Sequence, residues 1–254
     1  MSTRKPFSLH QIIGGRDEQQ DAILASRLGP YTLAPHLGPY TVAVIADGMG
    51  GHEDGREAAL CAAQAFFDYV RDRARQGSQD LRSLPMAALL HANAALKAQA
   101  GRGRSGTTLT GILASHRNCA WVHVGDTRLW HLSGGLSRIV THDMHVPYRR
   151  NVLYGSLPLR GGEALPPEHG CFPVALGDRL VLTSDGVHGP YEEEHDAWLN
   201  TPGCQTPWAD SDRGDGRGLV DAGDAQAVVE AGQAMHKGPE RLRDNASAIV
   251  VVVQ

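Results

Sequence analysis

Hydrophobic and polar positions in the first hundred residues predict two strands followed by two helices. Gln20 to Leu28 and the apolar run Thr41 to Ala46 are typical of β-strands, and the stretch rich in glycine and proline between them favours a hairpin-like connection. Glu53 to Gln76 has apolar residues at three- and four-residue steps and ends at a glycine, so it predicts a helix. Pro85 to Ala100 predicts a second helix, because proline is suited to a first helical turn.

After residue 106 the pattern changes to short apolar runs separated by turns. Two later strands, at Arg179 to Ser184 and Ser247 to Val253, are expected on either side of a helix at about Leu219 to His236. This grouping of strands and helices predicts an α+β layered fold rather than alternating βαβ units. We see no internal repeat, so we expect one domain, residues 1–254. The runs that predict an antiparallel meander are Thr107 to Ser115, Cys119 to Val124, Arg128 to Leu132 and Leu136 to Val140.

Composition and charge exclude several classes of protein. The 254 residues are 41% hydrophobic and 20% charged, as in ordinary globular proteins. The net charge of −4 argues against nucleic acid as the main partner. The longest apolar run, Ala248 to Val253, is far shorter than the ~20 residues of a membrane helix, and Met1 to His10 has no apolar core of signal-peptide length. Four scattered cysteines indicate neither zinc nor disulfides. We therefore expect a cytoplasmic protein without a membrane partner.

Four aspartates occur where predicted strands begin or end. Asp47, Asp126 and Asp185 each follow a strand, and Asp244 precedes the last one. Carboxylates placed in this way can converge on one site, and carboxylate oxygens are the ligands that Mg²⁺ and Mn²⁺ prefer. Gly48, next to Asp47, leaves its backbone carbonyl accessible to the same ion.

Taken one at a time, these segments have simpler interpretations. The Asp-Gly pairs at Asp47 and Asp185 are common at ordinary turns, and Asp126 fits the tip of a tight hairpin. Asp244 fits a cap at the entry to the last strand. The run from Arg16 to Asp21 fits a solvated charge cluster. No single segment decides between these interpretations and a metal site.

Considered together, the segments resemble the motif series of the metal-dependent protein phosphatases, the type 2C or PPM family, in its bacterial form. The resemblance extends over residues 14–253, and six motifs in the family's order are far more specific than any one of them. The segments that carry it are Arg16…Gln20-Asp21-Ala22, Ile45-Ala46-Asp47-Gly48-Met49-Gly50-Gly51-His52, Gly106-Thr107-Thr108, Gly125-Asp126-Thr127-Arg128, Thr183-Ser184-Asp185-Gly186 and Asp244-Asn245-Ala246-Ser247.

The resemblance implies a fold and an activity. The fold is a four-layer αββα sandwich, in which two mostly antiparallel sheets are flanked by helices. The activity is hydrolysis of phosphoserine and phosphothreonine by a hydroxide that bridges two Mn²⁺ or Mg²⁺ ions, with a third, weaker ion in bacterial members. The implied partners are phosphorylated protein substrates of a Ser/Thr kinase.

The resemblance also implies a role for each site residue. Asp47 would bridge two ions, and Asp126 with Asp185 would hold the third. Arg16 would bind the substrate phosphate as a bidentate fork, which a lysine could not reproduce. The residues implied to hold metal ions are Asp21, Asp47, Gly48, Asp126, Asp185 and Asp244.

Two positions depart from the family pattern. Met49 stands where animal members have a histidine proposed as the general acid, and His52 follows three residues later. His52 could protonate the leaving alkoxide, or it could simply pack the loop through one hydrogen bond. Gln19 is unusual in the first motif, which we expect to affect strand packing rather than chemistry.

A third departure concerns the variable flap of the family. Arg150 to Ser156 follows Asp143 almost directly, so the flap is expected to be shortened and the metal cleft more open. The loop Gly189 to Gly218, with Trp198 and Trp208, is a candidate for supplying specificity instead.

Two other functions remain alternatives at this stage. One is hydrolysis of a small phosphoester at the same metal centre, which an open cleft would favour. The other is a metal-binding pseudophosphatase that senses a partner without turnover. That reading is disfavoured, because such a protein would be expected to have lost at least one of the site aspartates, and all are present.

Overall fold

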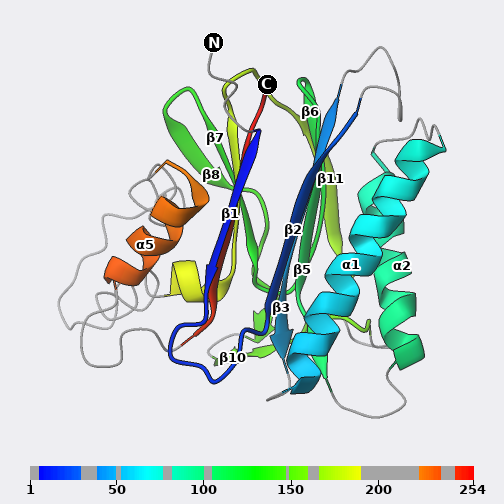
Figure 1. Ribbon diagram of the computed structural model, residues 1–254, viewed down its shortest axis with the longest axis vertical. Helices are drawn as coiled ribbons and strands as arrows, with labels where there is room; N and C mark the ends of the chain where they lie inside the picture. Colours follow the sequence, from blue (N-terminus) through cyan, green and yellow to red (C-terminus); the bar gives the residue numbers. More distant parts are fainter. Residues whose placement is uncertain are drawn as a thin grey trace.

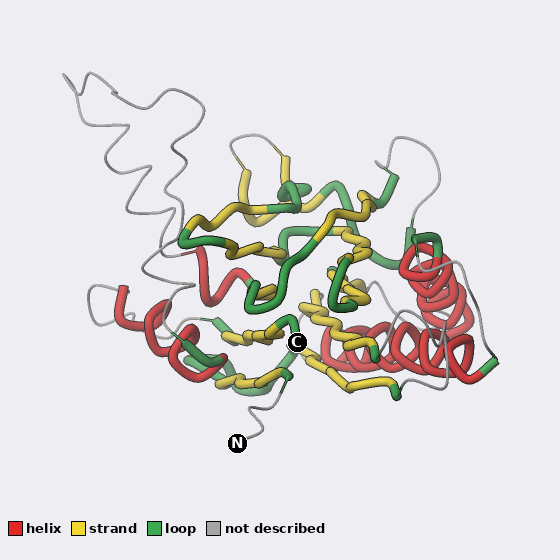
Figure 2. Tube along the Cα trace, turned by 90° about the horizontal axis from the view of Figure 1, so that it is seen from above, coloured by secondary structure: helices red, strands yellow, loops and turns green. Residues whose placement is uncertain are grey.

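The computed structural model describes residues 6–29, 39–49, 53–76, 82–99, 105–146, 149–159, 166–189, 223–235 and 244–254. In this part of the chain two β-sheets pack face to face, with helices on their outer surfaces (Figure 1). The view from above in Figure 2 shows the same layers edge-on. The arrangement confirms the α+β class and the four-layer αββα sandwich.

The first sheet carries the helix pair. Its strand order is β11-β6-β5-β3-β2, all neighbours are antiparallel, and the short β4 pairs with the end of β3. Two helices, α1 (Glu53–Arg75) and α2 (Leu84–Gln99), cover its outer face. The strands are β2 (Asp21–Leu28), β3 (Tyr40–Met49), β4 (Gly106–Thr107), β5 (Leu109–Ala114), β6 (Asn118–Val124) and β11 (Glu168–Pro173).

The second sheet has the order β1-β13-β12-β7-β8, again antiparallel throughout. Helix α5 (Ala225–Met235) packs on its outer face, against β1 and β13. A separate hairpin consists of β9 (His145–Val146) and β10 (Arg149–Leu153). The strands of the sheet are β1 (Phe7–Ile12), β7 (Arg128–Ser133), β8 (Leu136–Ile139), β12 (Arg179–Thr183) and β13 (Ala246–Val252).

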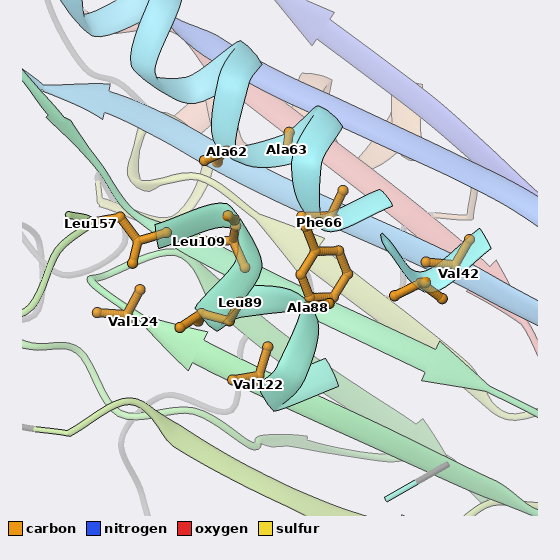
Figure 3. Close-up of a cluster of buried hydrophobic side chains, with 14 of the residues drawn as sticks. Val42, Ala62, Ala63, Phe66, Ala88, Leu89, Leu109, Val122, Val124 and Leu157 are labelled. Atoms are coloured by element: carbon orange, nitrogen blue, oxygen red, sulfur yellow. The ribbon is translucent and has the colours of Figure 1, made fainter. Parts of the chain in front are cut away.

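The central strands are apolar on both faces because both faces are covered. On β3, Val42 and Val44 pack toward the helix pair, whereas Ala43 and Ile45 pack toward the second sheet. Figure 3 shows the cluster on the helix side, where Phe66 of α1 lies among aliphatic side chains. Such double burial explains the unbroken apolar run in the sequence, and it fixes the strands whose ends carry the aspartates.

The predicted strands and helices are found, with bounds shifted by a few residues, but the predicted meander is wrong. β5 and β6 belong to the first sheet, whereas β7 and β8 belong to the second. The turn after β6 is therefore a corner at which the chain changes sheets. The sequence pattern did not distinguish such a corner from a hairpin turn, because both are short and contain glycine.

Several short strands were not predicted, namely β1, β9, β10 and β11. β1 and β11 lie at sheet edges and alternate between partly buried and exposed positions, so they carry few of the apolar residues that mark a strand. Among the described residues, no helix is long and apolar enough to cross a membrane.

Candidate metal centre

Asp21 and Asp47 lie directly opposite each other on neighbouring strands β2 and β3. Like charges at such a pair repel, which destabilises the sheet. Asp21 is only 4% exposed, and its Oδ1 atom is buried without a hydrogen-bond partner. A bound cation would satisfy this oxygen and remove the repulsion.

Two threonines hold the backbone of Asp47. Its N–H donates to Thr108 Oγ1 (N···O 2.9 Å). Its carbonyl accepts from the Thr108 N–H (2.9 Å) and from the Thr107 hydroxyl (2.9 Å). Pairing with β4 carries β3 past Asp47 to Met49. The strand end that carries the Asp47 carboxylate is therefore fixed from both sides.

Gly48 is confined by the start of α1. Its N–H donates to the Gln20 carbonyl (N···O 3.2 Å), and a Cβ atom at this position would lie 2.1 Å from the Gly55 carbonyl oxygen. A side chain here would force the helix away from the strand. The glycine thus lets α1 begin close beside Asp47.

β12 brings Asp185 to the same end of the sandwich. Asp185 opens a helical turn over residues 185–189, and its Oδ1 atom is buried without a hydrogen-bond partner. The preceding Ser184 donates its hydroxyl to Asp21 Oδ2 (O···O 2.9 Å) and accepts from the Ser247 N–H (3.0 Å). Ser184 therefore connects β12 and β13 of one sheet to Asp21 of the other.

Asn245 joins Asp244 to the segment that precedes β2. Its Oδ1 accepts from the Gln20 N–H (2.8 Å), and its Nδ2 donates to the carbonyls of Ile13 (2.8 Å) and Glu18 (3.0 Å). Asn245 is 3% exposed, so these bonds are shielded from water. They fix the segment that carries Arg16 and Asp21 against the entry to β13.

Asp126 lies at the corner where the chain passes from one sheet to the other. Gly125 has a φ of +113°, which favours glycine, and a Cβ there would lie 2.5 Å from the Thr108 side chain. Thr127 is fully buried, and its hydroxyl lies 2.7 Å from the Thr110 hydroxyl. The hairpin interpretation of Asp126 is therefore wrong, and the carboxylate extends from an anchored corner.

The carboxylates of the site raise one another's pKa. For Asp21, Asp47, Asp126 and Asp185, burial is the largest cause of the raised pKa, and a neighbouring carboxylate adds to it. Asp244 contributes to the raised pKa of Asp185 and of Asp47. Five aspartates thus lie close enough to interact electrostatically. A divalent cation would reverse the effect by favouring the ionised forms.

The donor set suits a hard cation, although the ligands are not yet arranged around one. Within the described ranges no three acidic, histidine or cysteine side chains form a ready set of metal ligands. Asp21 Oδ2 accepts from Ser184, and Asp244 Oδ2 accepts from Arg16. Binding an ion would therefore require carboxylates to rotate away from such partners. The orphaned oxygens of Asp21 and Asp185 fit this requirement.

Arg16 lies at the rim of the carboxylate cluster. Its guanidinium pairs with Asp244 (Nη2···Oδ2 2.7 Å), and its side chain is 51% exposed. The hydrogen bond to Asp244 is the main cause of a raised Arg16 pKa, and the charges of Asp185 and Asp47 add to it. A cation so placed can reach an anion that approaches from solvent.

Some sequence predictions fall outside the described residues. These are His52 and the loop tryptophans Trp198 and Trp208. The role of His52, as general acid or as a packing residue, stays a prediction. The same holds for the contribution of the loop to specificity.

Four residues that organise the site had no role in the sequence analysis, namely Thr107, Thr108, Ser184 and Asn245. All four lie inside the quoted motifs, and Ser184 and Asn245 directly adjoin an aspartate. Their small hydrogen-bonding side chains at strand ends were the available signal. The most distant partner of each of these four residues lies between 60 and 232 positions away in the sequence, so only the fold reveals it.

Comparison with protein families gives one match over most of the chain. Residues 18–205 match the family described as Protein phosphatase 2C. The serine/threonine protein phosphatase PstP of Mycobacterium tuberculosis (strain H37Rv) is 31% identical over 171 residues, which are 59% of this chain and 32% of the relative. The chain spans about one third of the length of the curated relatives it matches.

Solved structures of phosphatases share the fold. The crystal structure of M. tuberculosis PstP/Ppp superimposes with a TM-score of 0.68 at 23% identity and covers 98% of both chains. The PstP catalytic domain in complex with two manganese ions gives a TM-score of 0.65 at 22% identity, again over 98% of both chains. The PPM Ser-Thr phosphatase MsPP of M. smegmatis, in complex with cacodylate, gives 0.66 at 19% identity and 98% coverage of both.

Proposed function

The chain belongs to the protein phosphatase 2C family, and we propose that it is a metal-dependent protein serine/threonine phosphatase that hydrolyses phosphoserine and phosphothreonine. The observation that carries the proposal is the Asp21–Asp47 pair, opposed across two strands beside Asp185. A buried concentration of carboxylates is costly without a cation. The PstP catalytic domain, which shares the fold, binds two manganese ions.

The cofactors we propose are two Mn²⁺ or Mg²⁺ ions, with a third ion at Asp126 and Asp185. Asp47 would contribute to both of the first two sites, and the Gly48 carbonyl to one of them. Asp185 and Asp244 would complete one site, and Asp21 would face the other. Bound cations supply Lewis acidity, which polarises phosphoryl oxygens and makes water a stronger acid.

The protein's own groups bind and orient the substrate. The half-exposed guanidinium of Arg16 would bind the phosphate as a fork, with two parallel N–H donors. Thr107 and Thr108 hold the Asp47 backbone rigidly, which keeps the site preorganised. Asn245 keeps the Arg16 segment against β13, so the position of the phosphate site relative to the carboxylates is fixed.

We further propose that the 254 residues act as one phosphatase domain in the bacterial cytoplasm, in signalling opposite a Ser/Thr kinase. The partners would be phosphorylated proteins, with no nucleic acid or membrane involved. The described cysteines Cys61, Cys119 and Cys171 are free thiols, which suits a reducing compartment.

The first test is hydrolysis of a chromogenic aryl phosphate and of a phosphothreonine peptide. Each is assayed with Mn²⁺, with EDTA, and with the Asp185→Ala variant. We expect turnover that requires Mn²⁺ and that Asp185→Ala abolishes, because the variant loses a ligand. Asp72→Ala is the matched control, since Asp72 is an exposed aspartate in the last turns of α1.

The other outcomes separate the alternatives. Turnover of small phosphoesters without turnover of the phosphopeptide would favour a small-molecule hydrolase at the same centre. Bound Mn²⁺ with no turnover of any phosphoester would favour a pseudophosphatase. In that case Asp47→Asn should leave the cellular role intact.

A further inference from the structure

His188 is a buried histidine that the proposed mechanism does not use. It is 2% exposed and lies in the helical turn that Asp185 opens, three residues further along the chain. Its neighbours include Arg128 and Asp143, which follow the Asp126 corner. The position therefore lies between two of the carboxylate-bearing segments, one from β12 and one from the corner between the sheets.

Hydrogen bonding fixes the tautomer of His188. Trp130 Nε1 donates to Thr183 Oγ1 (3.0 Å), and Thr183 Oγ1 lies 2.9 Å from His188 Nδ1. A hydroxyl oxygen has two lone pairs and one proton, so Thr183 can accept from the indole N–H and donate its own proton to Nδ1. The second ring nitrogen, Nε2, decides which tautomer this requires.

The second ring nitrogen reaches the Asp126 corner. His188 makes a hydrogen bond to the backbone of Asp126. Nδ1 faces Thr183, so the bond to Asp126 is made by Nε2. An Nε2–H that donates to the Asp126 carbonyl leaves Nδ1 of the neutral ring to accept the Thr183 proton.

Contacts from the first sheet hold the corner independently of His188. The Thr127 hydroxyl lies 2.7 Å from Thr110 Oγ1, which in turn lies 2.8 Å from His123 Nδ1. These contacts hold the residue after Asp126, whereas His188 holds Asp126 itself. Only the bond from His188 joins the Asp126 backbone to the turn that Asp185 opens, among the contacts the structure describes.

We propose that His188 is a positioning residue that ties the Asp126 corner to the Asp185 turn and thereby sets the site that the two carboxylates would share for a divalent cation. This inference rests on the proposed function, because that function supplies the cation. His188 would not touch the ion or the substrate. It would act as outer-shell partners of metal ligands do, whose loss typically costs about 10–100-fold in metal affinity.

The test compares two substitutions, each of which replaces the hydrogen-bonding group of a different ring nitrogen. Asparagine in His188→Asn keeps an acceptor near the position of Nδ1 but cannot reach the Asp126 carbonyl. Glutamine in His188→Gln carries an N–H donor near the position of Nε2. His131→Asn is the control, because His131 is another mostly buried histidine, which lies on β7 beside β12 and is bonded to Asp178 just before β12 begins.

Mn²⁺ binding is measured by calorimetric titration of the full chain, with free Mn²⁺ counted by electron paramagnetic resonance. We expect His188→Asn to weaken the weakest binding step about tenfold or more. His188→Gln and His131→Asn should bind as the wild type does. Equal binding by His188→Asn and the wild type would overturn the inference, as would an equal loss in His188→Asn and His188→Gln.

A second measurement needs no metal. Amide hydrogen exchange of residues 125–128 in EDTA should be faster in His188→Asn than in His188→Gln or the wild type, because the corner loses its tie. Unchanged exchange would overturn the inference. A wild-type protein that takes up no Mn²⁺ would instead overturn the proposed function, and the exchange experiment would still decide whether the tie exists.

Discussion

Asp21 and Asp47 form a like-charged pair, directly opposed on the neighbouring strands β2 and β3. A cross-strand pair of this kind works against the stability of the sheet. Local rules of folding are most often broken at functional sites, where a ligand restores the balance. The pair is therefore the point at which stability and metal binding should be coupled.

Asp21→Asn should stabilise the metal-free protein. The amide removes one charge from the pair and can donate a hydrogen bond to Asp47, whereas its oxygen can still accept from Ser184. We expect a gain of about 1 kcal/mol, which corresponds to roughly 2–4 °C in Tm for a chain of this size. Thermal unfolding in EDTA measures it.

The same variant should respond less to metal. Mn²⁺ at a high fixed concentration should raise the Tm of the wild type more than that of Asp21→Asn. A ligand stabilises the folded protein more as its free concentration exceeds Kd, by about 2.7 kcal/mol when that concentration is 100 times Kd, and the variant should have the larger Kd. Asp72→Asn, on the exposed end of α1, serves as control. A variant that is less stable than the wild type in EDTA would contradict the repulsion argument.

Arg16→Ala should mainly raise KM. Arg16 would bind the phosphate in both the ground state and the transition state, and losing such binding changes KM rather than kcat. Hydrogen bonds to charged groups contribute about 1.5–3 kcal/mol, so we expect a rise of roughly ten- to a hundredfold. Arg16→Lys should stay impaired, because an ammonium cannot form the fork. Steady-state kinetics would contradict this role if kcat fell strongly at constant KM.

The central fold was predictable from sequence because its strands are buried on both faces. The continuous apolar runs of β3 and β13 mark their positions, and the helix that packs on β3 follows from its periodic apolar residues. Edge strands such as β11 carry little of this signal. The candidate ligands could be chosen from sequence because their motifs occur in a fixed order, and the structure brings these aspartates close enough to raise one another's pKa.

The arrangement of the corner was not predictable. Gly125-Asp126 reads equally well as a hairpin tip or as a passage between sheets, since either uses a glycine with positive φ. What decides it is the pairing of β7 with β12, in which Arg128 lies opposite Thr183. Bonds such as Ser184 to Asp21 likewise depend on contacts across 163 positions, which no local pattern encodes.

Thr108→Val should cost both stability and activity. The substitution keeps the shape but removes the hydroxyl that accepts from the Asp47 N–H, at a position that is 1% exposed. A buried donor left without its acceptor costs about 1–3 kcal/mol. Urea unfolding and aryl phosphate turnover measure the two effects. Thr108→Ser keeps the hydroxyl and should retain activity; equal loss in both variants would show that packing, rather than the hydrogen bond, matters.

The buried pair of Arg128 and Asp143 should give a pH-dependent contribution to stability. Burial alone would raise the pKa of Asp143, but the Arg128 fork (Nε···Oδ1 3.0 Å, Nη2···Oδ2 2.5 Å) outweighs it and lowers that pKa. A lowered folded-state pKa stabilises the protein above the unfolded value, about 3.9 for aspartate. This stabilisation is lost as the pH falls through the lower folded value.

Asp143→Asn should therefore destabilise the protein at pH 7 by about 3–5 kcal/mol, as expected for breaking a buried ion pair. The difference from the wild type should shrink below about pH 4. Urea unfolding in EDTA at several pH values measures it, because guanidinium would screen the pair. Asp72→Asn should cost less than about 1 kcal/mol at any pH, since its ion pairs are exposed. A difference that does not change with pH would rule out the ionic contribution.

The segment that follows β10 is pinned to the metal centre, which limits where a longer flap can be inserted. Leu157 exchanges backbone hydrogen bonds with Thr107 (2.9 and 2.8 Å), the residue whose hydroxyl binds the Asp47 carbonyl. The Leu159 N–H donates to Asn93 Oδ1 of α2 (2.7 Å). An insertion between Leu157 and Leu159 would disturb these bonds, whereas one between β9 and β10 lies outside them.

Grafting a full-length family flap between β9 and β10 should change which phosphopeptides are preferred and leave aryl phosphate turnover nearly constant. The sequence predicts a shortened flap that leaves specificity to other segments, so added contacts beside the metal centre should discriminate between peptides, whereas a small aryl phosphate would not reach them. Comparing kcat/KM over a set of phosphothreonine peptides measures the change.

An insert of equal length made of glycine and serine is the control, because it adds chain without contacts. Unchanged peptide preference after the graft would show that the short flap does not set specificity, and a loss of aryl phosphate turnover would show that the insertion had disturbed the bonds between Leu157 and Thr107.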